Sequence, residues 1–198
     1  YDYFCRKPVE KNKGIELLFV SRLLEGKGLQ YIIPELKKIQ KEFSGDIHLS
    51  IVGDGPYRNE LVNITKESGA EDLVSFHGTQ SKEKLLTYYS SADIFILPSK
   101  SEGMPNVVLE AMAMELPIII TPCEGSKELV LDNGIIAEYK DFAAAIVRLC
   151  KDSELRERMG KRSRELIEKN FHWKQIACQY ESVLKDIVRQ KEDYSKDV

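Results

Sequence analysis

The chain has 198 residues, of which 42% are hydrophobic, and a formal net charge of −3. Its length fits one globular domain, it has no apolar run of membrane-spanning length, and its weak negative charge argues against a nucleic-acid-binding protein. The four cysteines and three histidines are scattered and form no Cys-x-x-Cys pair, so we expect free thiols in a reducing cytoplasm and no metal site.

Residues 1–14 carry many charges and no periodicity, which predicts a linker or arm. Beyond them, apolar runs of strand length alternate with helical patterns. Strands are predicted at 15–21, 47–53, 73–78, 93–98 and 117–121, with a short sixth at 133–138. Helices are predicted at 29–43, where Pro34 indicates a kink or a late start, and at 56–69, 81–91, 106–114 and 140–191.

Strands and helices that alternate with short connections predict the α/β fold class. We expect a doubly wound parallel six-stranded Rossmann-like sheet with helices on both faces and a helical C-terminal segment. Ligands of such sheets bind at the carboxyl ends of the strands, where the strand order reverses. The loops that follow the strands are therefore the places to look for function.

The loop after the first strand, SRLLEGKG, contains neither a dinucleotide-binding nor a P-loop glycine pattern. It carries Arg22 and Lys27 instead, with Gly26 and Gly28 around the lysine. Both cations suit phosphate, and the glycines allow the backbone to approach a ligand closely. A surface arginine and a helix-capping lysine explain the same residues equally well. The Gly53–Gly55 turn after the second strand is explained by turn chemistry alone.

The loop after the fourth strand, SKSEGMPN, leads into a helix whose first turn is expected to contain Pro105. A helix N-terminus with exposed amides binds anions. If the first and fourth strands are neighbours, Arg22 and Lys27 face these amides across one crevice, and together they suggest a diphosphate site. The amides concerned are those of Gly103, Met104, Asn106 and Val107.

Glu102 and Glu110 flank this turn. On one helix they would lie roughly 12 Å apart, which is wider than a glycosidase acid/base pair requires. They are better interpreted as two acceptors for hydroxyl groups on either side of a phosphate site, a pattern that fits a nucleotide sugar. The alternatives are a solvated loop residue for Glu102 and a favourable charge near a helix start for Glu110.

Several segments closely resemble, in order and spacing, the C-terminal half of the group 1 glycosyltransferases (glycosyltransferase family 4). They are VSRLLEGKG, VGDGPYR, VSFHG, ADIFILPSKSEGMPNVVLEAMAMELPIIIT and FHWKQIACQYESVL. The resemblance covers roughly residues 15 to 190 and includes the family's Glu-x7-Glu signature at Glu102 and Glu110. It implies the GT-B architecture, in which two Rossmann-like domains face a cleft.

The resemblance implies a role for each matching residue. Arg22 and Lys27 match the pair that binds the diphosphate. Glu102 matches the carboxylate that contacts the donor sugar, and Glu110 the one that binds the ribose hydroxyls. The remaining implied contacts are the backbone of Gly103, Met104, Pro105, Asn106 and Val107 for sugar and phosphates, and Gly78 and Thr79 for the base. The family transfers sugars from nucleotide donors with retention of configuration and needs no metal at the site.

One departure lies after the fifth strand, where the family often has Gly-Gly-x-x-Glu and this chain has TPCEGSKE. Glu128 is the counterpart of that glutamate, and the stretch after it is shortened.

We expect a Rossmann-like nucleotide-sugar-binding domain at 15–172. We expect 173–198 to be a C-terminal helix and tail that cross toward an N-terminal domain, with Trp173 to Tyr180 packing locally and the apolar stripe beyond Val183 left without its partner.

Because the chain begins at Tyr1, we expect a fragment that lacks the family's N-terminal acceptor domain and transfers no sugar alone. The expected partners are a nucleotide sugar and a glycan or lipid-linked acceptor, with no nucleic acid. The full-length enzyme is expected in the cytoplasm, including peripheral association with the cytoplasmic face of the membrane. A GT-B-fold sugar-nucleotide epimerase and a non-catalytic nucleotide-sugar-binding module stay open as alternatives.

Overall fold

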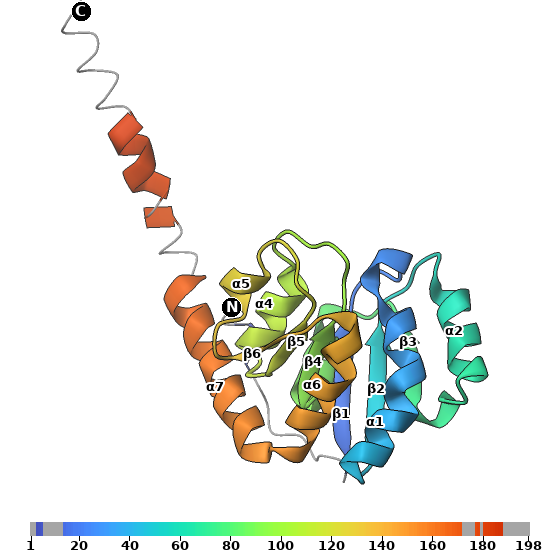
Figure 1. The fold of residues 1–198 in the computed structure, drawn as a ribbon. Helices are drawn as coiled ribbons and strands as arrows, with labels where there is room; N and C mark the ends of the chain where they lie inside the picture. The colour runs from blue at the N-terminus through green and yellow to red at the C-terminus, as the bar shows by residue number, and fades with distance from the viewer. Residues whose placement is uncertain (1–2, 6–13, 172–176, 179, 188–198) are drawn as a thin grey trace, which may run out of the picture.

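A computed structural model describes residues 3–5, 14–171, 177–178 and 180–187. Its centre is a six-stranded parallel sheet with the strand order β3-β2-β1-β4-β5-β6 (Figure 1). The strands are β1 (Ile15–Val20), β2 (Ile47–Val52), β3 (Val74–Gly78), β4 (Ile94–Leu97), β5 (Ile118–Ile120) and β6 (Gly134–Ile136). The order reverses between β1 and β4, where Leu17 lies opposite Ile94, so the predicted doubly wound sheet is confirmed.

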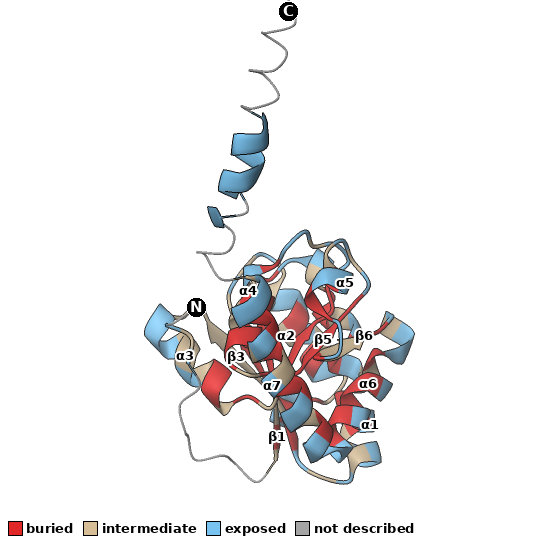
Figure 2. Ribbon diagram, turned by 90° about the vertical axis from the view of Figure 1, so that its left-hand side faces the viewer, coloured by how far each residue is buried: buried red, intermediate tan, exposed pale blue. Residues whose placement is uncertain are grey.

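Helices cover both faces of this sheet. They are α1 (Leu36–Phe43), α2 (Arg58–Glu67), α3 (Lys82–Ser91), α4 (Asn106–Ala113), α5 (Ser126–Leu129), α6 (Tyr139–Lys151) and α7 (Ser153–Asn170). Helices α1 and α6 pack side by side on one face, and Figure 2 shows α3 on the other. Helix α4 packs on β4 and β5 and against α7.

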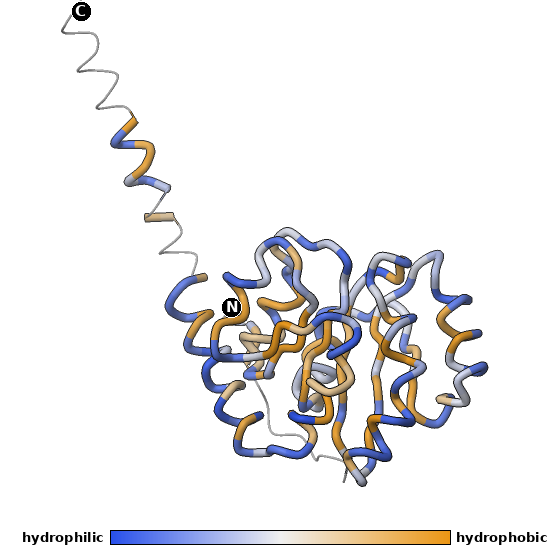
Figure 3. The backbone as a smooth tube through the Cα atoms, viewed as in Figure 1, coloured by the Kyte–Doolittle hydropathy of each residue, from blue (hydrophilic) through white to orange (hydrophobic). Residues whose placement is uncertain are grey.

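The strands are buried because helices lie on both sides of them. Leu17, Leu18 and Phe19 follow one another in β1, point alternately to the two faces, and are all fully buried. Figure 3 shows the apolar residues concentrated in the strands and the polar ones on the outer helices. Each buried side chain of this size contributes roughly 1.5–3 kcal/mol to the stability that holds the strand ends in place.

The predicted helix at 29–43 is wrong in its first half. Three short 3₁₀ helices precede α1, at Glu25–Lys27, Leu29–Tyr31 and Ile33–Glu35, and the α-helix begins only at Leu36. Pro34 lies in the first turn of the third one, where its missing N–H needs no partner. Of the two effects expected of Pro34, the late start is the one observed.

The predicted helix at 140–191 is also not continuous. Helix α6 ends at Lys151, and the Asp152 carboxylate accepts a hydrogen bond of 2.8 Å from the Leu155 amide to begin α7. Helix α7 ends at Asn170. In the described part of the chain, no helix combines the length and apolarity needed to cross a bilayer.

The C-terminal stripe is solvent-exposed where it is described. Val183, Leu184 and Ile187 are 53–60% exposed, so no described residue buries them, and their packing against an N-terminal domain stays a prediction. Tyr180 is 69% exposed, so the expectation that it packs locally is wrong. Trp173 and Ile176 lie outside the described residues. The predicted domain limits stay predictions.

Candidate functional site at the carboxyl edge of the sheet

The loops that follow β1 and β4 are docked on each other. The Lys100 amide donates a 2.8 Å hydrogen bond to the Gly26 carbonyl. Gly28 has a φ of +78°, and a Cβ atom there would lie 1.8 Å from the carbonyl oxygen of Pro98. Only glycine allows this approach, so Gly28 fixes how the two loops meet. This contact lies beside the point where the strand order reverses.

Two predicted site residues meet across these loops. The Lys27 ammonium lies 2.6 Å from Oε1 of Glu102, and the two side chains are 21% and 13% exposed. An ammonium has three donors, so Lys27 can hold Glu102 and a ligand anion together. The pair therefore places a cation and a carboxylate where the loops after β1 and β4 meet.

The loop after β4 ends in the expected helix N-terminus. Pro105 is the N-cap residue rather than part of the first turn, and no side chain caps the helix there. Pro105 is buried, whereas Gly103, Met104 and Asn106 are exposed. The first amides of a helix have no partner within it, so this N-terminus offers donors and a positive dipole end to an anion.

Glu110 is held by a residue that the sequence patterns did not single out. The hydroxyl of Tyr89, in α3, donates a 2.9 Å hydrogen bond to Oε2 of Glu110. Burial raises the pKa of the Glu110 carboxyl, while the hydrogen bond from Tyr89 and the charge of Lys82 act to lower it. Burial and the Glu110 charge raise the pKa of Tyr89 well above its usual value, so its hydroxyl keeps its proton.

Arg22 lies with the residues predicted to contact the base. It lines a pocket of about 410 Å³, together with Thr79 and residues from the ends of β1 and β2. Gly78 has a φ of +65° and its carbonyl accepts a 2.8 Å hydrogen bond from the Gly53 amide. The structure thus brings Arg22 to Thr79 and Lys27 to Glu102, in two groups along one edge of the sheet.

The glycines of the second loop do more than form a turn. Gly53 has a φ of +130°, and a Cβ atom on it would lie 1.9 Å from the carbonyl oxygen of Ser21. The Leu23 amide donates a 2.9 Å hydrogen bond to the Asp54 carbonyl. Both contacts brace the loop that carries Arg22, so the interpretation by turn chemistry alone is wrong.

The loop after β5 contacts the loop after β4, and this contact was not predicted. A Cβ atom on Gly125, which has a φ of +80°, would lie 2.3 Å from the Gly103 carbonyl. Burial and the Glu102 charge raise the pKa of the Cys123 thiol, which places this thiol beside the Lys27–Glu102 pair. Glu128 is exposed in α5. A close approach of two loops leaves no periodic signal in the sequence.

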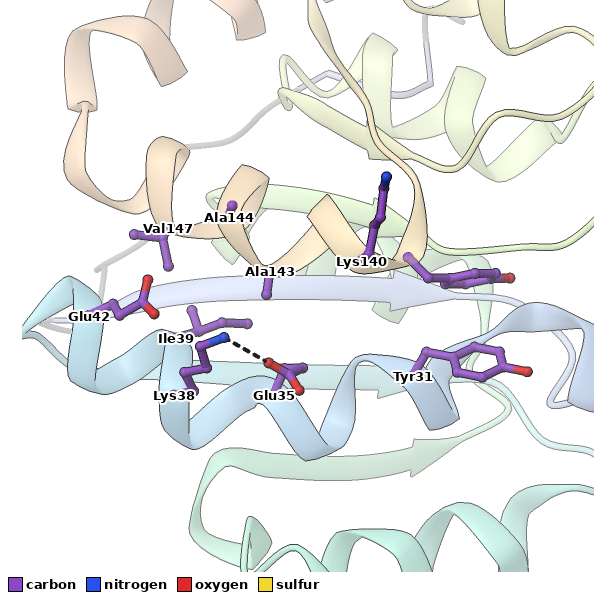
Figure 4. Close-up of a pocket in the computed structure, with 10 residues that line it drawn as sticks. Tyr31, Glu35, Lys38, Ile39, Glu42, Lys140, Ala143, Ala144 and Val147 are labelled. Carbon is purple, nitrogen blue, oxygen red and sulfur yellow. Dashed lines mark ion pairs between the residues drawn. The ribbon is translucent and has the colours of Figure 1, made fainter.

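A second pocket, of about 450 Å³, lies between α1 and α6 (Figure 4). Tyr31 and Tyr139 mark one end, with their ring centroids 4.4 Å apart. Figure 4 shows the ion pair between Glu35, at the end of the third 3₁₀ helix, and Lys38 of α1, with Lys140 extending away from it. None of the predicted site residues lines this pocket, and its charges are mixed and exposed.

A row of polar residues crosses the sheet near the start of β1. His48 lies 3.1 Å from the Glu16 carboxylate through Nδ1 and 2.9 Å from the Ser75 hydroxyl through Nε2. The contacts satisfy partly buried polar groups, as expected for a packed histidine. Neither pocket includes these residues. Among the described residues, no group of three or more His, Cys, Asp or Glu side chains could hold a metal ion.

A family model and several known proteins match this chain. The family model described as "Glycosyl transferases group 1" matches residues 4–166. An N-acetyl-alpha-D-glucosaminyl L-malate synthase of Bacillus anthracis is 32% identical over 199 aligned positions, which cover 94% of this chain and 51% of that protein. The chain spans about half the length of the curated relatives it matches.

Solved structures share the fold. The sucrose-phosphate synthase of Thermosynechococcus elongatus matches with a TM-score of 0.78 and 26% identity, over 90% of this chain and 46% of that one. Anabaena HepE, solved in complex with UDP, matches with a TM-score of 0.78 and 21% identity, over 88% of this chain and 49% of that one.

Proposed function

The chain belongs to the group 1 glycosyl transferases, and on that premise we propose that it is the donor-binding domain of a retaining glycosyltransferase. The donor is a nucleotide-diphosphate sugar, and the acceptor is a glycan or a lipid-linked sugar. One observation carries the proposal. The Lys27–Glu102 pair lies in the loops that meet beside the uncapped N-terminus of α4, where a diphosphate and its sugar would find a cation, backbone amides and a carboxylate together.

The positive charges at the carboxyl edge of the sheet suit a diphosphate leaving group. Negative charge builds on the diphosphate as the bond to the sugar breaks, and preorganised donors stabilise that charge most effectively. Lys27, Arg22 and the first amides of α4 supply such donors. Because these cations belong to the chain, we propose that the donor binds without a metal ion.

The two carboxylates have separate tasks in this proposal. Glu102 orients the donor sugar next to the diphosphate, and Glu110 accepts hydrogen bonds from the ribose hydroxyls. The base lies over the Gly78–Thr79 turn, in the pocket that Arg22 also lines. The UDP complex of HepE supports UDP as the first nucleotide to test. The retaining outcome rests on the family resemblance.

The relatives are about twice as long as this chain, which supports a second domain in the enzyme. We propose that an N-terminal domain supplies the acceptor half of the cleft, and that the stripe of Val183, Leu184 and Ile187 packs against it. We propose that the enzyme acts in the cytoplasm and binds a lipid-linked acceptor at the membrane surface.

The test is a panel of nucleotide sugars incubated with the full-length protein, with and without candidate acceptors. Formation of a glycosylated acceptor and release of the nucleoside diphosphate are expected, with the anomeric configuration of the donor kept in the product. An epimer formed from the donor alone would instead make the protein an epimerase. Tight binding of a nucleotide sugar without any turnover would make it a non-catalytic module.

A further inference from the structure

The Tyr89 hydroxyl connects two turns of the helix that forms the site. Tyr89 is fully buried in α3, and its hydroxyl lies 2.9 Å from Oε2 of Glu110 and 3.3 Å from the carbonyl oxygen of Val107. Both acceptors belong to α4. A buried tyrosine needs a partner for its hydroxyl, so the contact with Glu110 satisfies Tyr89 while it fixes one oxygen of the carboxylate.

The ring that presents this hydroxyl is held from two sides. Phe95 of β4 lies 6.1 Å from it between centroids, and Phe4 meets it edge-on at 6.0 Å. The Phe4 carbonyl accepts a 2.8 Å hydrogen bond from Arg164, whose guanidinium also donates to the Ala113 carbonyl at the end of α4. The hydroxyl therefore points at Glu110 from a rigid support.

We propose that Tyr89 is a positioning residue of the donor site. Its hydroxyl holds Oε2 of Glu110, which leaves Oε1 of the same carboxylate to accept hydrogen bonds from the ribose of the nucleotide. Tyr89 does not touch the ligand and acts only through Glu110. This inference rests on the proposed function, since it assumes that Glu110 meets a ribose.

The protonation of Glu110 gives this role a pH dependence. The titratable and charged side chains that act on Glu110 are Tyr89 and Lys82, and both favour the ionised carboxylate against the effect of burial. Without the hydroxyl, the pKa of Glu110 rises further. A ribose donates to the ionised form, so nucleotide affinity falls as the pH drops through that pKa. The fall begins at a higher pH when Tyr89 is replaced by phenylalanine.

Tyr89→Phe keeps the ring and its packing and removes only the hydroxyl. Calorimetric titrations of the protein with UDP, GDP and ADP, and with their 2′,3′-dideoxy forms, separate the ribose contact from the rest. The variant is expected to bind the preferred ribonucleotide about tenfold more weakly, the order set by one hydrogen bond to a charged group. Its affinity for the dideoxy form is expected to equal that of the wild type. Tyr88→Phe, on the same helix, serves as the matched control and is expected to change neither affinity.

A double variant tests whether the effect of Tyr89→Phe arises through Glu110 or from a general loss of structure. In a Glu110→Gln background, Tyr89→Phe is expected to add no further loss of ribonucleotide affinity, because the two residues act as one unit. Equal loss for ribo and dideoxy nucleotides, or unchanged affinity at every pH, would overturn the inference. A wild type that binds none of the three nucleotides would overturn the proposed function first, and the inference with it.

Discussion

Nζ of Lys27 lies 2.6 Å from Oε1 of Glu102, although 75 positions separate the two residues in the chain. They come from loops that follow different strands and meet because β1 and β4 are neighbours at the reversal of the strand order. The pairing holds the Lys27 ammonium among the loops beside the N-terminus of α4. It also orients the Glu102 carboxylate.

Lys27→Ala in the full-length enzyme is expected to lower the rate of sugar transfer by about 10²–10³, because one preorganised contact to the developing charge is lost. The free energy of unfolding is expected to fall by about 1–3 kcal/mol, the cost of leaving the largely buried Glu102 carboxylate without its partner. Lys161→Ala is the matched control, because Lys161 forms an ion pair of the same 2.6 Å length with Glu157 on the outside of α7. Equal rates for the two variants would contradict the role of Lys27.

Gly28→Ala is expected to lower the free energy of unfolding by at least about 1–2 kcal/mol, the usual cost of a positive φ in a residue with a Cβ atom. The clash with the Pro98 carbonyl adds to this and pushes the β1 and β4 loops apart. Gly26→Ala is the control, because nothing lies within 4 Å of a Cβ atom there. Urea unfolding and nucleotide titration of both variants check the effect. Two equally stable proteins would show that the loops do not depend on this contact.

The rate at which the Cys123 thiol is alkylated is expected to depend on the charge of Glu102. Burial and the Glu102 charge raise its pKa, so its reaction with iodoacetamide at neutral pH is expected to be slow and to accelerate as the pH rises. Glu102→Gln removes a negative charge, lowers this pKa and is expected to speed the reaction at fixed pH. Mass spectrometry of the labelled protein gives the rate, and a nucleoside diphosphate is expected to slow it.

Cys150 supplies the reference for this experiment. Burial raises its pKa to about 12, so it is expected to stay unlabelled until the protein unfolds. An identical rate for Cys123 with and without the Glu102 charge would place the thiol outside the influence of the site.

Much of the fold could be predicted from patterns along the chain. Continuous apolar runs identified the six strands, and their alternation with helices identified the parallel sheet. Residues 29–35 were wrongly predicted as α-helix because successive 3₁₀ turns repeat apolar positions every third residue, which a helical period also allows.

Only those site residues that stand in a recognisable local sequence pattern could be predicted. Glu102 and Glu110 stood out because carboxylates flank a glycine–proline turn. Tyr89 did not, because the adjacent Tyr88 and Tyr89 look alike in the sequence, and only the packing of α3 against α4 decides which hydroxyl reaches Glu110. The close approaches of Gly53 and Gly125 to neighbouring loops are tertiary contacts, which no local pattern encodes.

Treatment with a chelator is expected to leave nucleotide affinity unchanged. In the proposed function, Lys27 and Arg22 supply the positive charge that a divalent ion would otherwise provide. Calorimetric titration of UDP, GDP and ADP in EDTA and in Mg²⁺ gives the comparison. A site that binds only in Mg²⁺ would mean that these cations do not suffice for the diphosphate.

The most direct test of the account maps where a nucleoside diphosphate binds. The 22.7 kDa chain is small enough for backbone amide spectra by nuclear magnetic resonance during titration with UDP, GDP and ADP. The largest shifts are expected at residues 22–28, 78–79 and 102–110. Shifts centred on Lys38 and Lys140, in the pocket between α1 and α6, or no shifts with any of the three nucleotides, would contradict it.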